Sequence, residues 1–289
     1  MIPINLTSIK TRDGIWLDGI VAEPKRKNKT ALIWLHGLTS YFYSSPDLIK
    51  ELSRLCQQNG IGYFKFNTRG HDVVTRGQGT HTLLGTVYEK FEDCVYDIRA
   101  MVQYAKRMGY KNIVLTGHST GANKIVYYLY RTHDQSIKGE ILMGAANDIV
   151  GEIKRIGKKE FEKNVRLAQT LYKKDPLALF TSHGYIFTAE RALSLFTPKS
   201  AEDVFPYYDP HAEWKELKSI RVPAAVVFGS RDECLDRPAK DLISIFQKNA
   251  AQVKSFSGII IKGADHSFRK KEKELADTII YWIKKTHLC

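Results

Sequence analysis

Short apolar runs of strand length, most of them separated by helical segments, are the feature of this sequence that most constrains its fold. The runs cover residues 31–35, 61–66, 112–115, 140–143, 224–228 and 258–261. They are apolar on both faces, as strands of a parallel sheet covered by helices on both sides must be. Residues 4–9 and 15–22 alternate instead, and Arg12-Asp13-Gly14 between them is typical of a hairpin turn. The sequence therefore predicts an α/β fold with a mostly parallel sheet of about eight strands, flanked by helices.

Helices are predicted where apolar residues recur at intervals of three and four. This spacing occurs in residues 47–58 and 86–108, and again at Leu275, Ile279 and Trp282 near the C-terminus. Residues 122–131 also read as a helix.

Residues 147–216 break the alternation of strands and helices. They show helical pieces and no clear buried strand, and a segment of this length in an α/β fold is usually a lid or a binding element. Eight basic residues lie in its first part: Lys154, Arg155, Lys158, Lys159, Lys163, Arg166, Lys173 and Lys174. We expect one domain, residues 1–289, with a helical lid over 147–216.

The net charge of +13 arises from 44 Lys and Arg against 31 Asp and Glu. This balance favours either an anionic partner or simply a solvated, lysine-rich surface, and we prefer the second interpretation. No zinc finger, RNA-binding aromatic motif or basic tail supports binding to nucleic acid.

The N-terminus lacks the features of a signal peptide, and no apolar run is long enough for a membrane-spanning helix, so we expect a cytoplasmic protein. A homodimer is left open.

The pentapeptide Gly117-His118-Ser119-Thr120-Gly121 follows an apolar strand and precedes a helix. This is the setting of a G-x-S-x-G nucleophile elbow, in which a tight turn presents the serine hydroxyl at the sheet edge. The two glycines avoid clashes between the strand and the helix. The alternative is a glycine-rich turn whose serine only caps the helix. We predict that Ser119 is a nucleophile.

A serine nucleophile needs a base, and the base needs an acid to orient it. Asp232 follows the run 224–228 and His266 follows the run 258–261, in the order that this kind of site requires. We predict Asp232 as the acid and His266 as the base. Glu233 and Asp236 are alternatives for the acid.

A tetrahedral intermediate needs two backbone N–H groups directed at its oxyanion. We predict that Leu38 and Thr120 supply them, with Gly37 allowing the close approach of the early loop. His36 is expected to hydrogen-bond within that loop, without a chemical role.

Further residues are expected to line the substrate pocket. They are His36, Gly37, Thr39, Tyr41, Phe42 and His118. Tyr41 and Phe42 could equally belong to the core. Residues 67–72 are predicted to form a wall of the site, in which Arg69 and His71 organise the loop.

Five motifs together resemble those of the α/β-hydrolase superfamily. They are His36-Gly37-Leu38, Asn67-Thr68-Arg69-Gly70-His71, Gly117-His118-Ser119-Thr120-Gly121, Gly229-Ser230-Arg231-Asp232 and Gly263-Ala264-Asp265-His266. They occur in the order of that superfamily and span most of the chain. Within it, the sequence is most similar to small feruloyl- or cinnamoyl-esterases and acylglycerol lipases.

A weaker similarity, to hydrolases that include siderophore esterases, is carried by residues 191–195 and 202–205. One departure is His71-Asp72-Val73, where many relatives have a further Gly or Ser, and it predicts a longer loop.

The resemblance implies a Ser-His-Asp triad that works through an acyl-enzyme, without a metal or an organic cofactor. The predicted function is hydrolysis of a small carboxylic ester, with an anionic or aromatic substrate as a hypothesis. A thioesterase, an amidase or an acyltransferase would use the same triad, and a non-catalytic binding protein on this fold is a further alternative.

Overall fold

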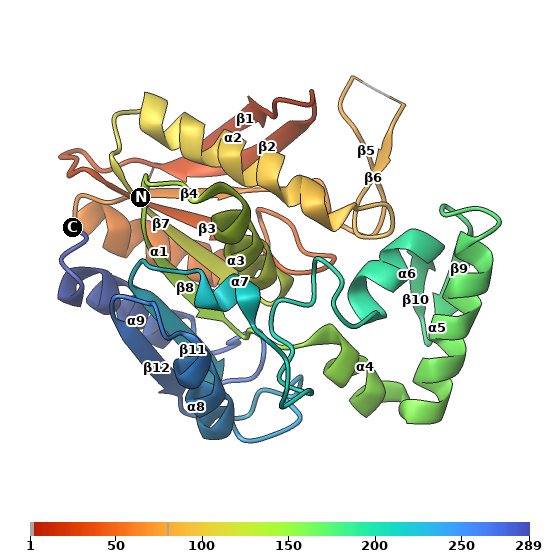
Figure 1. Cartoon of the computed structure of the whole chain (residues 1–289). Helices are drawn as coiled ribbons and strands as arrows, with labels where there is room; N and C mark the ends of the chain where they lie inside the picture. The colour runs from red at the N-terminus through yellow and green to blue at the C-terminus, as the bar shows by residue number, and fades with distance from the viewer. Residues whose placement is uncertain (1–2, 80) are drawn as a thin grey trace.

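The computed structural model describes residues 3–79 and 81–289 and is organised around one eight-stranded sheet (Figure 1). The strands lie in the order β1-β2-β4-β3-β7-β8-β11-β12. Their bounds are β1 Asn5–Lys10, β2 Trp16–Ala22, β3 Thr30–Leu35, β4 Gly62–Phe66, β7 Asn112–His118, β8 Ile137–Met143, β11 Ala224–Gly229 and β12 Phe256–Ile261. The pairs β1–β2 and β2–β4 are antiparallel and all other pairs are parallel, which confirms the predicted fold class.

Helices cover both faces of this sheet. One face packs against α2 (Cys94–Arg107), α3 (Thr120–Thr132) and α8 (Ala239–Asn249). The other packs against α1 (Pro46–Gln58) and α9 (Glu272–Lys285). Successive side chains of a strand point to opposite faces, so Ile33 packs with the first group and Leu32 with the second.

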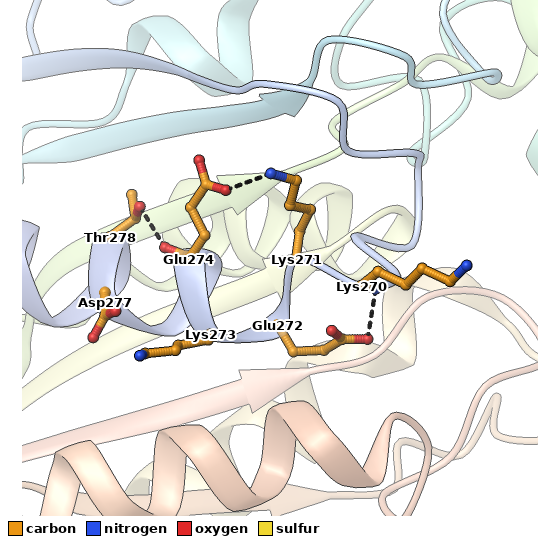
Figure 2. A pocket seen from close by; sticks show the side chains of 7 residues that line it. All are labelled: Lys270, Lys271, Glu272, Lys273, Glu274, Asp277 and Thr278. Carbon is orange, nitrogen blue, oxygen red and sulfur yellow. Dashed lines mark hydrogen bonds and ion pairs between the residues drawn. The ribbon is translucent and has the colours of Figure 1, made fainter.

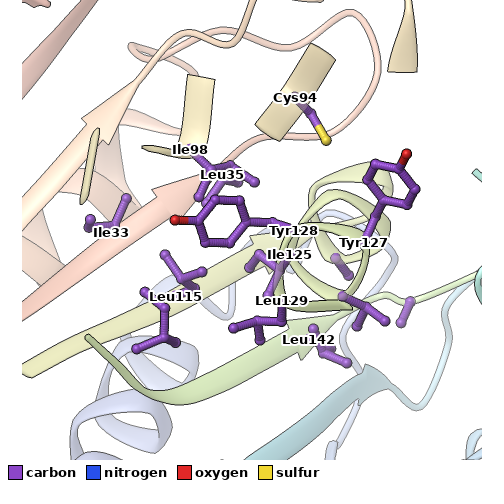
Figure 3. Close-up of a cluster of buried hydrophobic side chains, with 14 of the residues drawn as sticks. Ile33, Leu35, Cys94, Ile98, Leu115, Ile125, Tyr127, Tyr128, Leu129 and Leu142 are labelled. Carbon is purple, nitrogen blue, oxygen red and sulfur yellow. The ribbon is translucent and has the colours of Figure 1, made fainter. Parts of the chain in front are cut away.

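The core beneath α3 shows why the elbow region is rigid (Figure 3). Figure 3 labels these buried side chains from β3, β7, β8, α2 and α3: Ile33, Leu35, Cys94, Ile98, Leu115, Ile125, Tyr127, Tyr128, Leu129 and Leu142. All ten are at most 7% exposed. The helix that follows Ser119 is therefore fixed along its length against the sheet.

The predicted helix over residues 86–108 starts later than expected. A short 3₁₀ turn, η1 (Phe91–Asp93), leads into α2 at Cys94. Upstream, the Thr86 hydroxyl donates to Gly70 O and accepts from Thr39 N, both at 2.9 Å, and Glu89 pairs with Lys124. These side chains hold the segment in a loop conformation that apolar spacing alone does not reveal.

Residues 148–196 lie to one side of the sheet in Figure 1, and the chain then returns to the body, where residues 215–218 pack near α3. The elements of the 147–216 segment are α4 (Asp148–Ile156), α5 (Lys158–Tyr172), β9 (Leu179–Ser182), β10 (Tyr185–Thr188), α6 (Ala189–Phe196) and α7 (Lys215–Lys218). Besides the predicted helical pieces, the segment contains a half-buried antiparallel hairpin of β9 and β10, which the sequence did not reveal. Each strand has only four residues and buries part of one face, which is too little for a clear sequence pattern.

A second small hairpin follows His71. It pairs β5 (Thr75–Arg76) with β6 (Leu83–Leu84) and extends beside the 147–216 segment in Figure 1. The residues that follow His71-Asp72-Val73 thus form a hairpin.

Candidate active site

Ser119 stands at the sharp turn between β7 and α3. Its backbone has φ 54° and ψ −128°, a region that residues other than glycine rarely adopt. Ser119 N donates to Met143 O at the end of β8 (2.8 Å), which ties the turn to the neighbouring strand. A strained serine held in this way has its hydroxyl on the outside of the turn, at the carboxyl edge of the sheet.

The glycines around Ser119 are required by close backbone contacts. A Cβ at Gly117 would lie 2.4 Å from Gly121 O, and a Cβ at Gly121 would lie 2.5 Å from Leu35 O. A Cβ at Gly37 would lie 2.9 Å from the Cβ of Ser119, so glycine is also needed for the early loop to reach the serine. Three segments thus meet at the elbow at distances that only glycine permits.

The backbone N–H groups of Leu38 and Thr120 flank this turn. Within the described residues, neither of them has a hydrogen-bond acceptor in the protein. Thr120 is the first residue of α3, and the positive end of a helix dipole favours negative charge there. Both N–H groups are therefore available to an anionic oxygen.

His266 and Asp232 come together as predicted from their order in the chain. Nδ1 of His266 lies 2.9 Å and 3.0 Å from the two carboxylate oxygens of Asp232. The Asp232 side chain is fully buried, and its Oδ1 also accepts from Cys234 N at 3.0 Å. The alternatives for the acid are placed differently, because Glu233 accepts from the backbone N–H of His266 and Asp236 pairs with Arg237.

The surroundings of His266 favour its protonated form. Burial lowers the pKa of His266, but hydrogen bonding to Asp232 and to the Cys234 thiol outweighs it and raises the pKa to about 10. Ligand atoms of Asp232, Cys234 and His266 lie within 4.8 Å of one another, the kind of cluster that can also hold a metal ion. In this structure the Asp232 carboxylate and the His266 imidazole are hydrogen-bonded to each other.

Ser119 and His266 line the same cavity, but no hydrogen bond joins the hydroxyl to the imidazole in the described part of the chain. Contacts between a nucleophile and its base are often long before substrate binds, and they tighten in the complex.

His118 supports His266 from the elbow. Its Nε2 donates to His266 O at 2.8 Å, and the two rings lie 4.9 Å apart. Burial, together with the charge of His266, lowers the pKa of His118 to about 4, so the ring is neutral near pH 7. His118, predicted as a pocket residue, therefore positions the loop that carries His266.

His36 and Arg69 organise loops, in agreement with their sequence interpretation. Burial and the nearby Lys124 lower the pKa of His36 well below its usual value. The neutral ring donates from Nδ1 to Gly37 O and accepts at Nε2 from Thr68 N, each at 2.9 Å. Arg69 pairs with Asp97 at 2.9 Å, and Asp13 also contacts its guanidinium.

A cavity of about 530 Å³ opens at Ser119 and His266 beneath the 147–216 segment. Leu38 and Thr39, in the loop after β3, form the part of the cavity wall that belongs to the sheet body. Its other residues are Thr86, Ala146, Asn147, Asp148, Gly151, Glu152, Lys154, Arg155, Tyr185, Phe187, Leu195, Phe196, Glu233 and Cys234. An adjoining hollow of about 370 Å³, which also includes His36, Gly37 and His118, reaches Lys65 on the far side of Ser119.

Tyr41 and Phe42 do not line either hollow, which corrects their prediction as pocket residues. The Tyr41 ring packs on Tyr43 with centroids 4.1 Å apart. Phe42 packs against the core cluster under α1 and lines a separate apolar depression with Ile4 and Leu6. The aromatic wall of the cavity comes instead from β10 and α6, which sequence analysis did not identify as wall elements.

A further depression, at the start of α9, has no relation to this chemistry (Figure 2). Its lining residues are Lys270, Lys271, Glu272, Lys273, Glu274, Asp277 and Thr278. Lys271 and Glu274 pair at 2.8 Å, and Glu272 accepts from Lys270 N, as the dashed lines in Figure 2 show. It is a charged surface formed by one helix end.

A family model described as "Protein of unknown function (DUF1749)" matches residues 20–285. The chain belongs to the DUF1749 family. A search of curated proteins gave no match for this protein.

Solved structures with the same architecture include Est1E from Butyrivibrio proteoclasticus with bound ferulic acid, which is 18% identical with a TM-score of 0.67. That match covers 98% of this chain and all of the other. The siderophore hydrolase EstB from Aspergillus fumigatus is 17% identical with a TM-score of 0.67, covering 99% and 98% of the two chains. A monoglyceride lipase from Saccharomyces cerevisiae is 16% identical, with the same TM-score and coverage of 99% and 96%. These similarities show that the DUF1749 chain has the α/β-hydrolase fold.

Across residues 3–79 and 81–289, no helix is both long enough and apolar enough to cross a bilayer.

Proposed function

We propose that this protein is a serine hydrolase that cleaves carboxylic esters of small molecules through an acyl-enzyme. The observation that carries the proposal is the strained Ser119, which opens onto the same cavity as a buried His266–Asp232 pair. A serine in this conformation is unfavourable and is retained where the hydroxyl must be presented for attack.

In the proposed reaction, Nε2 of His266 takes the Ser119 proton while the serine oxygen attacks the ester carbonyl. The N–H groups of Leu38 and Thr120 stabilise the oxyanion, and Asp232 stabilises the imidazolium. His266 then protonates the leaving alcohol, and the acyl group remains on Ser119. A water molecule, deprotonated by His266, releases the acid.

We further propose that residues 147–216 act as a lid within a single domain, 1–289. This segment supplies most of the cavity wall, and the aromatic rings of Tyr185, Phe187 and Phe196 favour an acyl or alcohol part with an apolar body. The similar esterase Est1E binds ferulic acid, an aromatic acid, which agrees with such a wall.

The basic residues of α4 and α5 give little support to an anionic substrate. Only Lys154 and Arg155 of the eight line the cavity. Lys154 donates to the carbonyls of Glu233 and Leu235, and Arg155 pairs with Glu152. The remaining six are largely solvated.

Hydrolysis of an aryl acetate tests the proposal. Ser119→Ala should lower kcat/KM by at least about 10⁴-fold, because the nucleophile is lost while the oxyanion donors remain. Circular dichroism should show unchanged folding. Ser219→Ala, at a serine remote from the cavity, is the control and should retain full activity. Retained activity in Ser119→Ala would overturn the proposal.

A panel of leaving groups separates the related activities. Matched ester, thioester and amide substrates with one acyl group should show the ester as the preferred class. A preference for the thioester or the amide would be consistent with the proposed triad, but it would make the protein a thioesterase or an amidase and not an esterase.

A further inference from the structure

Asp148 presents an unused carboxylate to the cavity. It is the first residue of α4, shortly after Gly144, where a Cβ would lie 2.9 Å from Cε1 of His266. It lines the cavity together with Ser119 and His266. In the part of the chain that the structure describes, no hydrogen bond or ion pair engages the carboxylate of Asp148.

The other charged groups of the cavity are already paired. Glu152 accepts from Arg155 at 2.6 Å and 2.8 Å, and Lys154 is held by two backbone carbonyls. Glu233 accepts from His266 N at 2.9 Å. Among the described residues of the lining, Asp148 is therefore the charged side chain that has no hydrogen-bond partner of its own.

The two cations whose charge favours ionised Asp148, Arg191 and His266, already have carboxylate partners. Arg191 is neutralised by Glu202 and Glu89 in a fully buried cluster, and His266 pairs with Asp232. Burial and the charge of Glu202 raise the pKa of Asp148 to about 7, although Arg191 and His266 act in the opposite direction. Asp148 is only partly exposed, so its unpaired carboxylate is incompletely solvated, and a cation in the cavity would stabilise its ionised form.

We propose that Asp148 binds a cationic group of the substrate, so that the preferred esters carry an ammonium-type cation on an apolar body. The apolar part would pack on Phe187, Leu195 and Phe196, which line the same cavity. This inference rests on the proposed esterase function and names its substrate class. Simple stabilisation of the α4 N-terminus would not require a carboxylate that faces the cavity: Asp47, in the first turn of α1, is exposed.

The test uses p-nitrophenyl esters of ω-trimethylammonio acids and their neutral isosteres, in which carbon replaces nitrogen. One such pair is 4-(trimethylammonio)butanoate and 5,5-dimethylhexanoate, and longer chains extend the series. At pH 8, where Asp148 is ionised, the wild-type protein should prefer the cationic ester of at least one pair by about 10-fold in kcat/KM. Asp148→Asn should reduce that preference to near 1 while leaving the neutral ester within about 3-fold of the wild-type value.

Asp47→Asn is the matched control, because it removes the same charge from a helix N-terminus outside the cavity. It should leave the preference unchanged. The preference is a ratio within one preparation, so a partly unfolded variant does not disturb it. Wild-type protein that favours the neutral ester at every chain length, or a preference that survives in Asp148→Asn, would overturn the inference. Failure to hydrolyse the neutral esters at all would instead contradict the proposed function.

Discussion

The sheet body and the 147–216 segment are stabilised in different ways. The body buries two extensive apolar clusters, one on each face of the sheet. Residues 148–196 of the segment have only a small cluster of their own, which includes Phe161 and Phe187, whereas Phe205 and Trp214 later in the segment pack in the core of the body. Polar contacts attach residues 148–196: Arg191 pairs with Glu89 of the body and with Glu202, and Lys154 donates to Glu233 O and Leu235 O.

This difference parallels a division of labour in the proposed site. Ser119, Asp232 and His266 all follow strands of the sheet, where a tightly packed core fixes their positions. Asp148 and the aromatic wall belong to the segment. The proposed catalytic residues thus belong to the tightly packed sheet body. The proposed substrate-selecting residues belong to the 147–216 segment, whose first part has a smaller apolar core.

After Ser119→Ala, Asp232→Asn should have the largest effect on activity of the substitutions in the body. It removes the acceptor that fixes the tautomer of His266, and kcat should fall by about 10⁴-fold. Glu233→Gln is the control, since the Glu233 carboxylate accepts from the backbone N–H of His266 and not from its ring, and its activity should fall by less than about 10-fold. Steady-state kinetics on an aryl acetate give both values. Equal losses in the two variants would mean that the acid is wrongly assigned.

Arg191→Met should have the largest effect in the 147–216 segment. It leaves Glu89 and Glu202 buried without their shared cation, and the free energy of unfolding should fall by about 3–5 kcal/mol. Denaturant unfolding measures the loss. Arg166→Met removes an exposed arginine of α5 and should change the stability by less than about 1 kcal/mol. If both variants were equally stable, the buried cluster would not anchor the segment.

The pH dependence tests the link between Cys234 and His266. The base must be neutral to accept the Ser119 proton, so kcat/KM should rise as pH increases through the alkaline range set by the raised pKa of His266. Because the thiol contributes to that raised pKa, Cys234→Ala should move the rise to lower pH. The variant should gain at most about 10-fold near pH 7 relative to the wild type. A rise that moves to higher pH would contradict this role of Cys234.

The smallest effect is expected at the exposed wall of the cavity. Tyr185 stacks on Phe187 with centroids 6.2 Å apart and is half exposed. Tyr185→Ala should lower kcat/KM for aryl-substituted acyl esters by about 2- to 10-fold and leave acetate esters unchanged. A comparable loss on acetate esters would place Tyr185 in the chemistry rather than in substrate selection.

The sequence predicted those parts of the fold and of the site that a local residue pattern determines. The inner strands could be predicted because a strand buried on both faces must be apolar, as residues 224–228 are. The outer strands β1 and β12 are partly exposed, so the expectation that residues 258–261 are covered on both faces was wrong. The elbow could be predicted because only glycine fits at Gly117 and Gly121. Asp232 and His266 followed from their places after strands, and the structure brings their side chains together.

The remaining features depend on contacts that local sequence does not encode. The buried cluster of Arg191, Glu89 and Glu202 joins residues far apart in the chain, and each alone resembles a surface charge. Asp148 lies in a cavity whose other lining residues come from distant parts of the chain, so its role could not be predicted from its neighbours in the sequence. Tyr41 and Phe42 follow the early loop, yet the chain turns them away from Ser119.

The central claim is that Ser119 is the nucleophile, and covalent labelling tests it most directly. A fluorophosphonate probe reacts with a serine that its histidine activates, and peptide mass spectrometry locates the adduct. The proposed mechanism predicts a stoichiometric adduct on Ser119, none on Ser119→Ala, and slow labelling of Asp232→Asn. An intact, folded protein that remains unlabelled, or that carries the adduct on another serine, would contradict it.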